Sequence, residues 1–493
     1  MIMEKTQGIL TALAAVRPST RSEEKAYDAS IRQHIALLNS SASEIHALVL
    51  NMTKEILEGL DPSLHSISYL FILQMLTETV QNESQVSSKL ILDAIVEFII
   101  KFDPIQIRYA GQPFRMLLEK IGGGHMFPAS VAVELLVTAI LRIEPTGSLF
   151  TSTHFVLAQL AYNSNSVESA LRVIDREILF YPHTMNAKVN SVFCDPSLPP
   201  TSYISTISGL TDQITSTTVL EYGYIRGLMY MSRRDWTKAK EAFEQVILHP
   251  AKDRAMSKIM LDSYKRWVLV ALLGQGKAPT LPSYSTGTAH LIYEIAAKAY
   301  GSVAEAFVST EAAFLKSQIE ENAALWEEDG TSTLLQEVLA SYQKWQILGL
   351  RSIYQRAEIS MIRRMTVNAV TGKTLENDDA VLTLVRQMME DGTLDGQLER
   401  DDSGTCYLSF TTSTLTEREF ASEIAQSFRN IQSINQQYKQ MNDQLSSTKE
   451  YVQHLLMEKL MEKSRSDKDG VNPWANYALQ LEDEDLMSST PKR

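Results

Sequence analysis

The sequence predicts a mainly α-helical protein with helical repeats, a small domain that contains a β-hairpin, and one long C-terminal helix. Three observations indicate this. The 493 residues contain only 21 Gly and 15 Pro, below the roughly 7% and 5% of average proteins. Apolar residues recur every three to four positions over most of the first 330 residues, as in Ile45, Val49 and Met52, which is the spacing of a helix with one buried face. From Ile424 onward they recur every seven positions.

Composition excludes several classes of protein. With 46 Lys+Arg against 59 Asp+Glu, the formal net charge is −13, which argues against nucleic-acid binding by the whole chain. Cys194 and Cys406 are too few for a disulfide framework or a cysteine zinc site. The most apolar runs, 90–100 and 267–273, are too short or too charged to span a bilayer. No signal-peptide pattern opens the sequence, so we expect a soluble, intracellular, acidic protein.

Residues 1–200 and 201–330 predict successive helical hairpins, and the second block is similar to tetratricopeptide repeats. That 34-residue pattern has small or apolar residues where its two helices cross, followed by a proline. Pro182 and Pro250 are 68 residues apart (250 − 182), twice this period. Ordinary hairpins without a true repeat are the alternative. The residues at the crossing offsets are Gly227, Tyr230, Ala239 and Phe243 in 220–251, and Ala158, Ala161, Ala170 and Ile174 earlier.

Residues 185–218, between these repeat-like segments, differ in composition. Thr201–Thr218 contains 10 Ser or Thr in 18 residues and is preceded by Pro196, Pro199 and Pro200. Clusters of this kind form loops. The segment is therefore predicted to be a loop or a poorly ordered insertion.

Residues 331–412 predict a winged-helix domain, in which three helices precede a β-hairpin. Helices are expected over 333–349, 353–366 and 378–390. Gly392 suits the left-handed residue that ends the third helix. Two strands, within 393–399 and 405–410, flank the polar turn at 400–404.

Residues 415–463 predict one long helix, because neither Pro nor Gly interrupts 417–463. At 1.5 Å per residue it would be roughly 65–70 Å long, so its apolar seam requires partner helices. Residues 464–493, with the acidic run 482–485, are expected to form a disordered acidic tail. The seam residues of this predicted helix-bundle interface are Ile424, Ile431, Tyr438, Leu445 and Val452, with Ile434, Met441 and Leu455 on a second line offset by three.

No pattern of catalytic, cofactor-binding or metal-ligating residues is present in the sequence. The nine histidines form no His-x-His or His-Glu-x-x-His pair. Residues 371–374 end like a phosphate-binding loop, but Val367 stands where that loop requires glycine. We therefore expect no enzymatic activity, no cofactor and no metal.

The predicted winged helix carries charges of both signs. Basic residues on its early helices would suit a reader of nucleic acid, whereas acidic residues gather around the hairpin. A contact with protein is favoured, and a nucleic-acid-binding winged-helix adaptor is the alternative. The basic residues are Arg351, Arg356, Arg363, Arg364 and Lys373, and the acidic ones are Glu390, Asp391, Asp395, Glu399, Asp401 and Asp402.

The order of these parts resembles PCI-domain proteins, the family that builds the proteasome lid, the COP9 signalosome and translation initiation factor 3. Segments spread over most of the chain are similar to PCI subunits of the COP9 signalosome. A related subunit of the proteasome lid is the alternative within the family. The segments that carry the resemblance are 60–66, 107–110, 259–265, 268–276 and 389–394.

The resemblance implies a non-catalytic scaffold in the nucleus and cytoplasm. The COP9 signalosome removes the modifier Nedd8 from cullin-RING ubiquitin ligases, and its peptidase subunit has a zinc-binding Glu and His-x-His motif that this chain lacks. PCI subunits associate through the edges of their winged-helix sheets and through a bundle of C-terminal helices. The resemblance thus places Tyr407, Leu408 and Phe410 at a sheet-edge contact. It implies subunits 1 and 8 as neighbours, cullin-RING ligases as indirect partners, and neither a membrane nor nucleic acid as a partner.

Overall fold

The computed structural model describes residues 7–12, 21–79, 88–182, 193–196, 198–250, 256–282, 287–309, 311–401, 404–410, 417–446, 451–452 and 455–457. The chain divides into two compact units, Met1–Thr414 and Leu415–Arg493. Helices and one small sheet make up the described elements. The prediction of a mainly helical protein is therefore confirmed.

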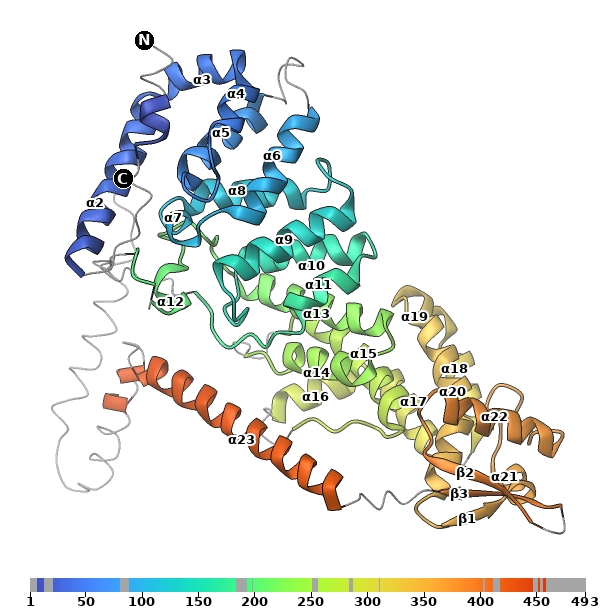
Figure 1. The fold of residues 1–493 in the computed structure, drawn as a ribbon. Helices are drawn as coiled ribbons and strands as arrows, with labels where there is room; N and C mark the ends of the chain where they lie inside the picture. The colour runs from blue at the N-terminus through green and yellow to red at the C-terminus, as the bar shows by residue number, and fades with distance from the viewer. Residues whose placement is uncertain are drawn as a thin grey trace, which may run out of the picture. The chain divides into compact units, whose positions relative to one another are not determined.

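Helices account for every element of the first unit up to residue 350 (Figure 1). The first set is α2 (Arg21–Ser40), α3 (Ala42–Asn51), α4 (Thr53–Glu58), α5 (Ser66–Thr79), α6 (Ser88–Lys101), α7 (Pro104–Ile107), α8 (Gly111–Gly122), α9 (Ala129–Ile143), α10 (Ser152–Asn163), α11 (Val167–Ile174) and α12 (Pro200–Tyr203). The next set is α13 (Ser216–Ser232), α14 (Trp236–Ile247), α15 (Lys258–Gln275), α16 (Gly287–Ala296), α17 (Lys298–Val308), α18 (Ala312–Glu321), α19 (Ala323–Glu328) and α20 (Ser332–Leu350).

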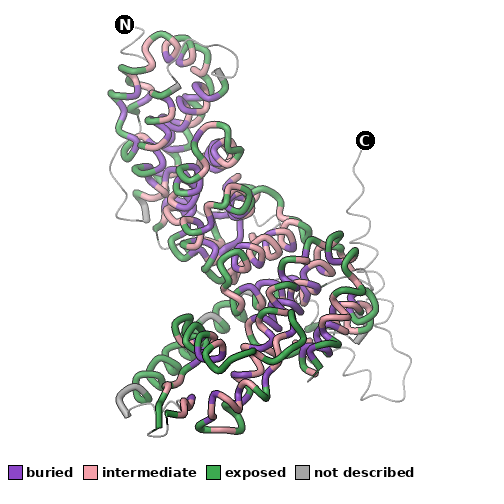
Figure 2. The backbone as a smooth tube through the Cα atoms, turned by 90° about the vertical axis from the view of Figure 1, so that its right-hand side faces the viewer, coloured by how far each residue is buried: buried purple, intermediate pink, exposed green. Residues whose placement is uncertain are grey.

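Neighbouring helices of this unit pack against each other largely in chain order. Helix α5 lies against α6, α8 against α9, α9 against α10 and α11, and α13 between α10 and α14. One cluster of buried apolar residues continues from Leu10 to Ala369, and Figure 2 shows buried residues recurring along successive helices. Such an array is stable because each hairpin covers an apolar face that its neighbour cannot bury alone.

The hairpins α10–α11 and α13–α14 share one turn geometry. Asn165 and Arg234 lie in the left-handed region, with φ of 55° and 62°. In each turn the next amide donates to a carbonyl five residues back, at 2.9 and 3.0 Å, as in a Schellman helix end. The two hairpins are therefore equivalent at an offset of 69 residues (234 − 165), one more than the spacing of the two prolines. The crossing residues obey the same offset: Ala158 and Gly227, Ala161 and Tyr230, Ala170 and Ala239, Ile174 and Phe243.

Gly227 allows α13 and α14 to approach closely. A Cβ atom at this position would lie 2.5–2.7 Å from three ring atoms of Phe243. That ring is fully buried, so it has little room to move aside. A small residue at the helix crossing is thus a packing requirement here.

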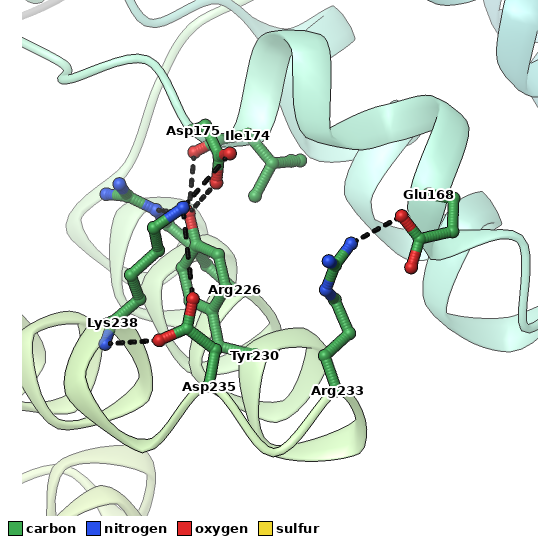
Figure 3. Close-up of polar contacts among 8 residues, drawn as sticks. All are labelled: Glu168, Ile174, Asp175, Arg226, Tyr230, Arg233, Asp235 and Lys238. Atoms are coloured by element: carbon green, nitrogen blue, oxygen red, sulfur yellow. Dashed lines mark hydrogen bonds and ion pairs between the residues drawn. The ribbon is translucent and has the colours of Figure 1, made fainter. Parts of the chain in front are cut away.

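Polar contacts join α11 to the hairpin α13–α14 (Figure 3). The Tyr230 hydroxyl donates to the Asp175 carboxylate over 2.8 Å, and the Lys238 ammonium lies 3.1 Å from the other oxygen of that carboxylate. A second ion pair links Arg233 to Glu168 at 2.6 Å. Because Tyr230 is almost completely buried, its hydroxyl would be costly to leave without an acceptor. The contact therefore fixes how the two hairpins stack.

The segment 198–215 is packed against the repeats. The Arg108 guanidinium donates to the carbonyls of Phe193 and Asp195, at 3.0 and 2.8 Å, and lies 3.8 Å from the centre of the Tyr203 ring. Tyr203 in turn donates to the Ile143 carbonyl. The prediction of a loop is confirmed for 204–215, but it is wrong for 200–203 and 216–218, which belong to helices α12 and α13. The alternative of a poorly ordered insertion is wrong for 198–215. Residues 185–192 and 197 lie outside the described residues.

A small antiparallel sheet follows α20 and completes the first unit. Its strands β1 (Arg356–Glu358), β2 (Gly396–Arg400) and β3 (Cys406–Phe410) are ordered β1-β3-β2. The helices α21 (Ile359–Met365) and α22 (Asp378–Glu390) lie between β1 and β2 in the chain. A separate apolar cluster from Ile347 to Phe410 holds helices and sheet together. The helix predicted at 378–390 and the hairpin predicted within 393–410 are both confirmed.

The predicted helix 353–366 is wrong over its first part. Residues 356–358 form strand β1, which pairs with Tyr407–Ser409 of β3, and α21 begins only at Ile359. Three residues are too few to display a period of two, so pairing with a distant strand decides their structure.

The second unit contains helix α23 (Glu417–Ser446). Residues 451–452 and 455–457 are also helical. The remainder of the predicted helix 417–463, and the predicted tail 464–493, lie outside the described residues. At 1.5 Å per residue, α23 alone is about 45 Å long.

Candidate protein-interaction surfaces

The apolar stripe of α23 is exposed. Ile431, Ile434 and Tyr438 are 60%, 62% and 65% exposed, and every α23 side chain that the structure describes is exposed. At 100° per residue, the apolar side chains occupy an arc of about 140°. Exposed stripes of this kind mark sites of protein interaction. These apolar side chains, called the α23 stripe, are Phe420, Ile424, Phe428, Ile431, Ile434, Tyr438 and Met441.

Three further predicted seam residues lie after Met441 in the sequence. Val452 and Leu455 are helical and exposed. Leu445 lies in α23, but its side chain is outside the described part of the chain. The structure therefore places the described seam residues in helical conformation with their side chains accessible.

Two residues of the α23 stripe, Phe420 and Phe428, were not predicted from the heptad spacing. Phe420 lies seven positions before Ser427, which itself lies seven before Ile434, so the polar serine interrupts the second line. Phe428 immediately follows that serine, and both phenylalanines are exposed. The sequence did contain a signal for Phe420, because positions 420, 427 and 434 are spaced by seven residues. A strict heptad search misses it, since Ser427 is polar.

The middle of the stripe has uncharged flanks. Between Asn430 and Tyr438 every non-apolar residue is Asn, Gln or Ser. Charged residues beside an apolar seam usually set the choice of partner through ion pairs. The middle of the α23 stripe therefore offers a partner only apolar side chains and uncharged polar ones.

Strand β3 is the middle strand of the sheet, not an edge. The Phe410 amide donates to the Gln355 carbonyl beside β1, at 2.9 Å. Because antiparallel strands exchange hydrogen bonds at every second residue, Phe410 and Leu408 bond toward β1, and Tyr407 bonds toward β2. The expectation of a sheet edge at Tyr407, Leu408 and Phe410 is therefore wrong, since the unpredicted strand β1 occupies that side.

The open edges are the outer sides of β1 and β2. Residue 401 donates to residue 405 across the turn, so by alternation the backbone groups of Gly396, Leu398 and Arg400 point away from β3. Within the described residues no further strand pairs with either edge. Unpaired edge groups of this kind accept an added strand.

Two basic residues of this domain, Arg356 and Arg363, are paired with acids. Arg356 lies 3.4 Å from Glu399 and covers the Tyr407 ring at 4.1 Å from its centre. Arg363 lies 2.9 Å from Asp378. These pairs use up charge that a nucleic-acid phosphate would need.

Two residues of types that often serve in catalysis, Cys194 and His154, are buried in the core of the repeats. The buried Cys194 thiol donates to the Glu24 carbonyl at 3.1 Å, and burial raises the pKa of this thiol. Burial also lowers the pKa of His154 to about 4. Among the described residues, no three or more His, Cys, Asp or Glu side chains are grouped to hold a metal ion. No helix in the described ranges is long and apolar enough to cross a bilayer.

Comparison with known proteins identifies the family. A family profile described as "COP9 signalosome complex subunit 3, N-terminal helical repeats" matches residues 28–289, which supports N-terminal helical repeats. The chain is 34% identical to COP9 signalosome complex subunit 3 of Neurospora crassa, over 98% of this chain and 99% of that protein. It is 30% identical to the protein of the same name from Emericella nidulans, over 67% of this chain and 68% of that protein. The chain therefore belongs to the COP9 signalosome complex subunit 3 family.

Proposed function

We propose that this chain is a non-catalytic scaffold subunit of the COP9 signalosome, which removes Nedd8 from cullin-RING ubiquitin ligases. The observation that carries the proposal is the α23 stripe, an apolar surface whose side chains are exposed from Phe420 to Met441. Family membership identifies the complex to which the missing partner helices would belong. The protein would act in nucleus and cytoplasm, with subunits 1 and 8 as neighbours and cullin-RING ligases as indirect partners.

The proposal includes a domain plan. Residues 1–200 would form N-terminal repeats and 201–330 tetratricopeptide-like repeats that lead into the PCI domain. Residues 331–412 would form its winged-helix part, supported by the order of α20, β1, α21, α22, β2 and β3 in the chain. Residues 415–463 would be the bundle helix and 464–493 a disordered acidic tail.

Two surfaces would join this chain to its neighbours. The α23 stripe would enter a bundle with helices of other subunits, where burying the exposed part of Ile431, Ile434 or Tyr438 contributes about 1–2 kcal/mol each. The outer edge of β1 or β2 would pair with a strand of an adjacent winged helix through backbone hydrogen bonds. Predicted bundle contacts thus extend from Ile424 to Leu455.

The experiment compares two sets of aspartates on α23. Ile431→Asp, Tyr438→Asp and Leu445→Asp introduce charges along the seam and are expected to abolish co-purification of the tagged chain with signalosome subunits, because a charge buried without a partner is costly. The matched control, Gln432→Asp with Gln436→Asp, adds charges outside the apolar arc and should leave assembly unchanged.

Circular dichroism of both variants establishes that the repeats remain folded. Normal co-purification of the seam variant would contradict the bundle proposal. Partner identity is read by mass spectrometry of the purified assembly. A set of proteasome-lid subunits in place of signalosome subunits would contradict the assignment to this complex.

A further inference from the structure

A groove of about 940 Å³ lies in the N-terminal repeats. Its walls come from the end of α2, the start of α3, α5, the start of α8 and residues 206–213. The size lies in the range of sites that hold ligands or peptide segments. Apolar side chains that line it and are at least partly accessible are Ile35, Phe71, Met75, Met116 and Ile207.

Two glycines build one wall of this groove. Gly209 has φ of +76°, and a Cβ there would lie 2.6 Å from the amide nitrogen of Gln112 at the start of α8. Opposite it, a Cβ on Gly111 would lie 2.3 Å from the Ser208 carbonyl. Loop and helix therefore touch through their backbones, and only glycine permits this approach. The contact holds Ile207 at the wall, where its side chain is 58% exposed.

The charges of the groove favour a basic occupant over an acidic one. Of the described lining residues, Glu78 and Asp212 are acidic and Arg115 is the single basic residue. Arg115 lies 2.8 Å from Glu119 and 3.1 Å from Asp212, so two carboxylates already occupy its guanidinium. The rest of the polar rim consists of uncharged side chains, among them Asn39, Gln74 and Gln112. With one basic and two acidic residues, the lining has a formal net charge of −1, so a segment with Lys or Arg is favoured over an acidic one.

We propose that this groove binds a basic amphipathic segment of another subunit of the assembled complex. Apolar side chains of that segment would pack on Met75, Met116 and Ile207, and its Lys or Arg residues would lie toward Glu78 and Asp212. Methionine is flexible and polarisable, so it adapts to side chains of different shape. The run Glu482–Asp485 of the chain's own sequence is disfavoured by its charge. The inference rests on the proposed function, because the partner is expected within the same complex.

The experiment places the photoreactive residue p-benzoylphenylalanine at Ile207 of the full chain, within the reconstituted signalosome. The control carries the same residue at Val308, which is equally exposed at 59% but does not line the groove. After illumination, mass spectrometry identifies the cross-linked peptide. The expected product from Ile207 is one peptide of a neighbouring subunit, with Lys or Arg beside apolar residues.

A charge reversal tests the chemistry of recognition. Glu78→Lys should lower the cross-link yield from Ile207 at least about tenfold, since like charges across an interface are strongly unfavourable. Glu241→Lys, at an exposed position of α14 outside the groove, should leave the yield unchanged. Both variants should still enter the complex if α23 mediates assembly.

Three results would overturn the inference. They are a yield at Ile207 no higher than at Val308, a cross-link within this chain, and a cross-link to an acidic peptide. The complex is isolated before illumination, so failure of assembly is seen separately. Loss of the wild-type chain from the complex contradicts the proposed function, whereas an assembled complex without the cross-link contradicts the groove proposal alone.

Discussion

Replacement of Gly227 by alanine tests how the second equivalent hairpin is held together. The added Cβ would lie 2.5–2.7 Å from three atoms of the Phe243 ring, which is fully buried. Overpacking a core by a methyl group costs about 1–3 kcal/mol, while exchanging Gly for Ala inside a helix gains about 1 kcal/mol. We therefore expect Gly227→Ala to lower the free energy of unfolding by up to about 2 kcal/mol.

The matched control is Gly301→Ala in α17. No atom lies within 4 Å of a Cβ at this position, so only the helix-propensity gain applies and the variant should be about 1 kcal/mol more stable than wild type. The difference between the two alanine variants isolates the packing cost, about 1–3 kcal/mol. Urea unfolding of the full chain, followed by circular dichroism at 222 nm, measures it.

A double variant locates the cost at the ring. Adding Phe243→Leu to Gly227→Ala removes ring atoms beside the new methyl group and should restore part of the loss, with a coupling energy of about 0.5–3 kcal/mol. Equal stabilisation by Gly227→Ala and Gly301→Ala would refute the reasoning. So would strict additivity in the double variant.

Three further predictions concern other parts of the chain. The buried His154 imidazole, with a pKa of about 4 against an ordinary 6.5, is neutral when folded and protonated in the unfolded chain between these values. The contribution of His154 to the free energy of unfolding is therefore fully present above pH 6.5, and up to about 3 kcal/mol is lost as pH drops toward 4. His154→Gln should reduce the pH dependence of the free energy of unfolding, measured with urea, between these values. An unchanged pH dependence in this variant would contradict the prediction. At the left-handed Asn165, Asn165→Val should cost about 1–2 kcal/mol and Asn165→Gly almost nothing, compared by thermal unfolding; equal midpoints would refute the turn geometry. Arg400→Pro removes a backbone N–H of β2 that points away from β3 and is not used in the pairing with β3. This variant should therefore assemble less with signalosome subunits in quantitative pull-downs, whereas Arg400→Ala should not. Equal yields of the two variants would argue against a contact through β2.

The local parts of the fold were predictable because their signals are local. Helix α22 (Asp378–Glu390) combines an acidic first turn, periodic apolar residues and Gly392 at its end, so both boundaries match the prediction. Strand β1 was missed because Arg356–Glu358 becomes a strand only through pairing with β3. That single omission also misplaced the sheet edge, since the hairpin alone leaves β3 uncovered on one side.

Of the two candidate interaction surfaces, the one on a single helix was predictable and the one built from distant segments was not. The described seam from Ile424 to Met441 was found from spacing alone, because one helix displays it entirely. The groove was missed because its walls are far apart in sequence, and the contact of Gly111 with residues 208–210 spans about a hundred positions. The composition predicted the loop at 204–215 correctly, but nothing in a run of Ser and Thr indicates that the Arg108 guanidinium lies over the Tyr203 ring.

The two open edges of the sheet differ in length, three residues in β1 and five in β2. A neighbour added beyond one edge meets a different surface from a neighbour added beyond the other. If the β1 edge of one chain joins the β2 edge of the next, each contact is heterologous, and the resulting row has a direction. Such a row ends with one bare edge on each terminal member unless it closes into a ring. The order of subunits along the row would then follow from which edges match, so each position could be occupied by one particular chain.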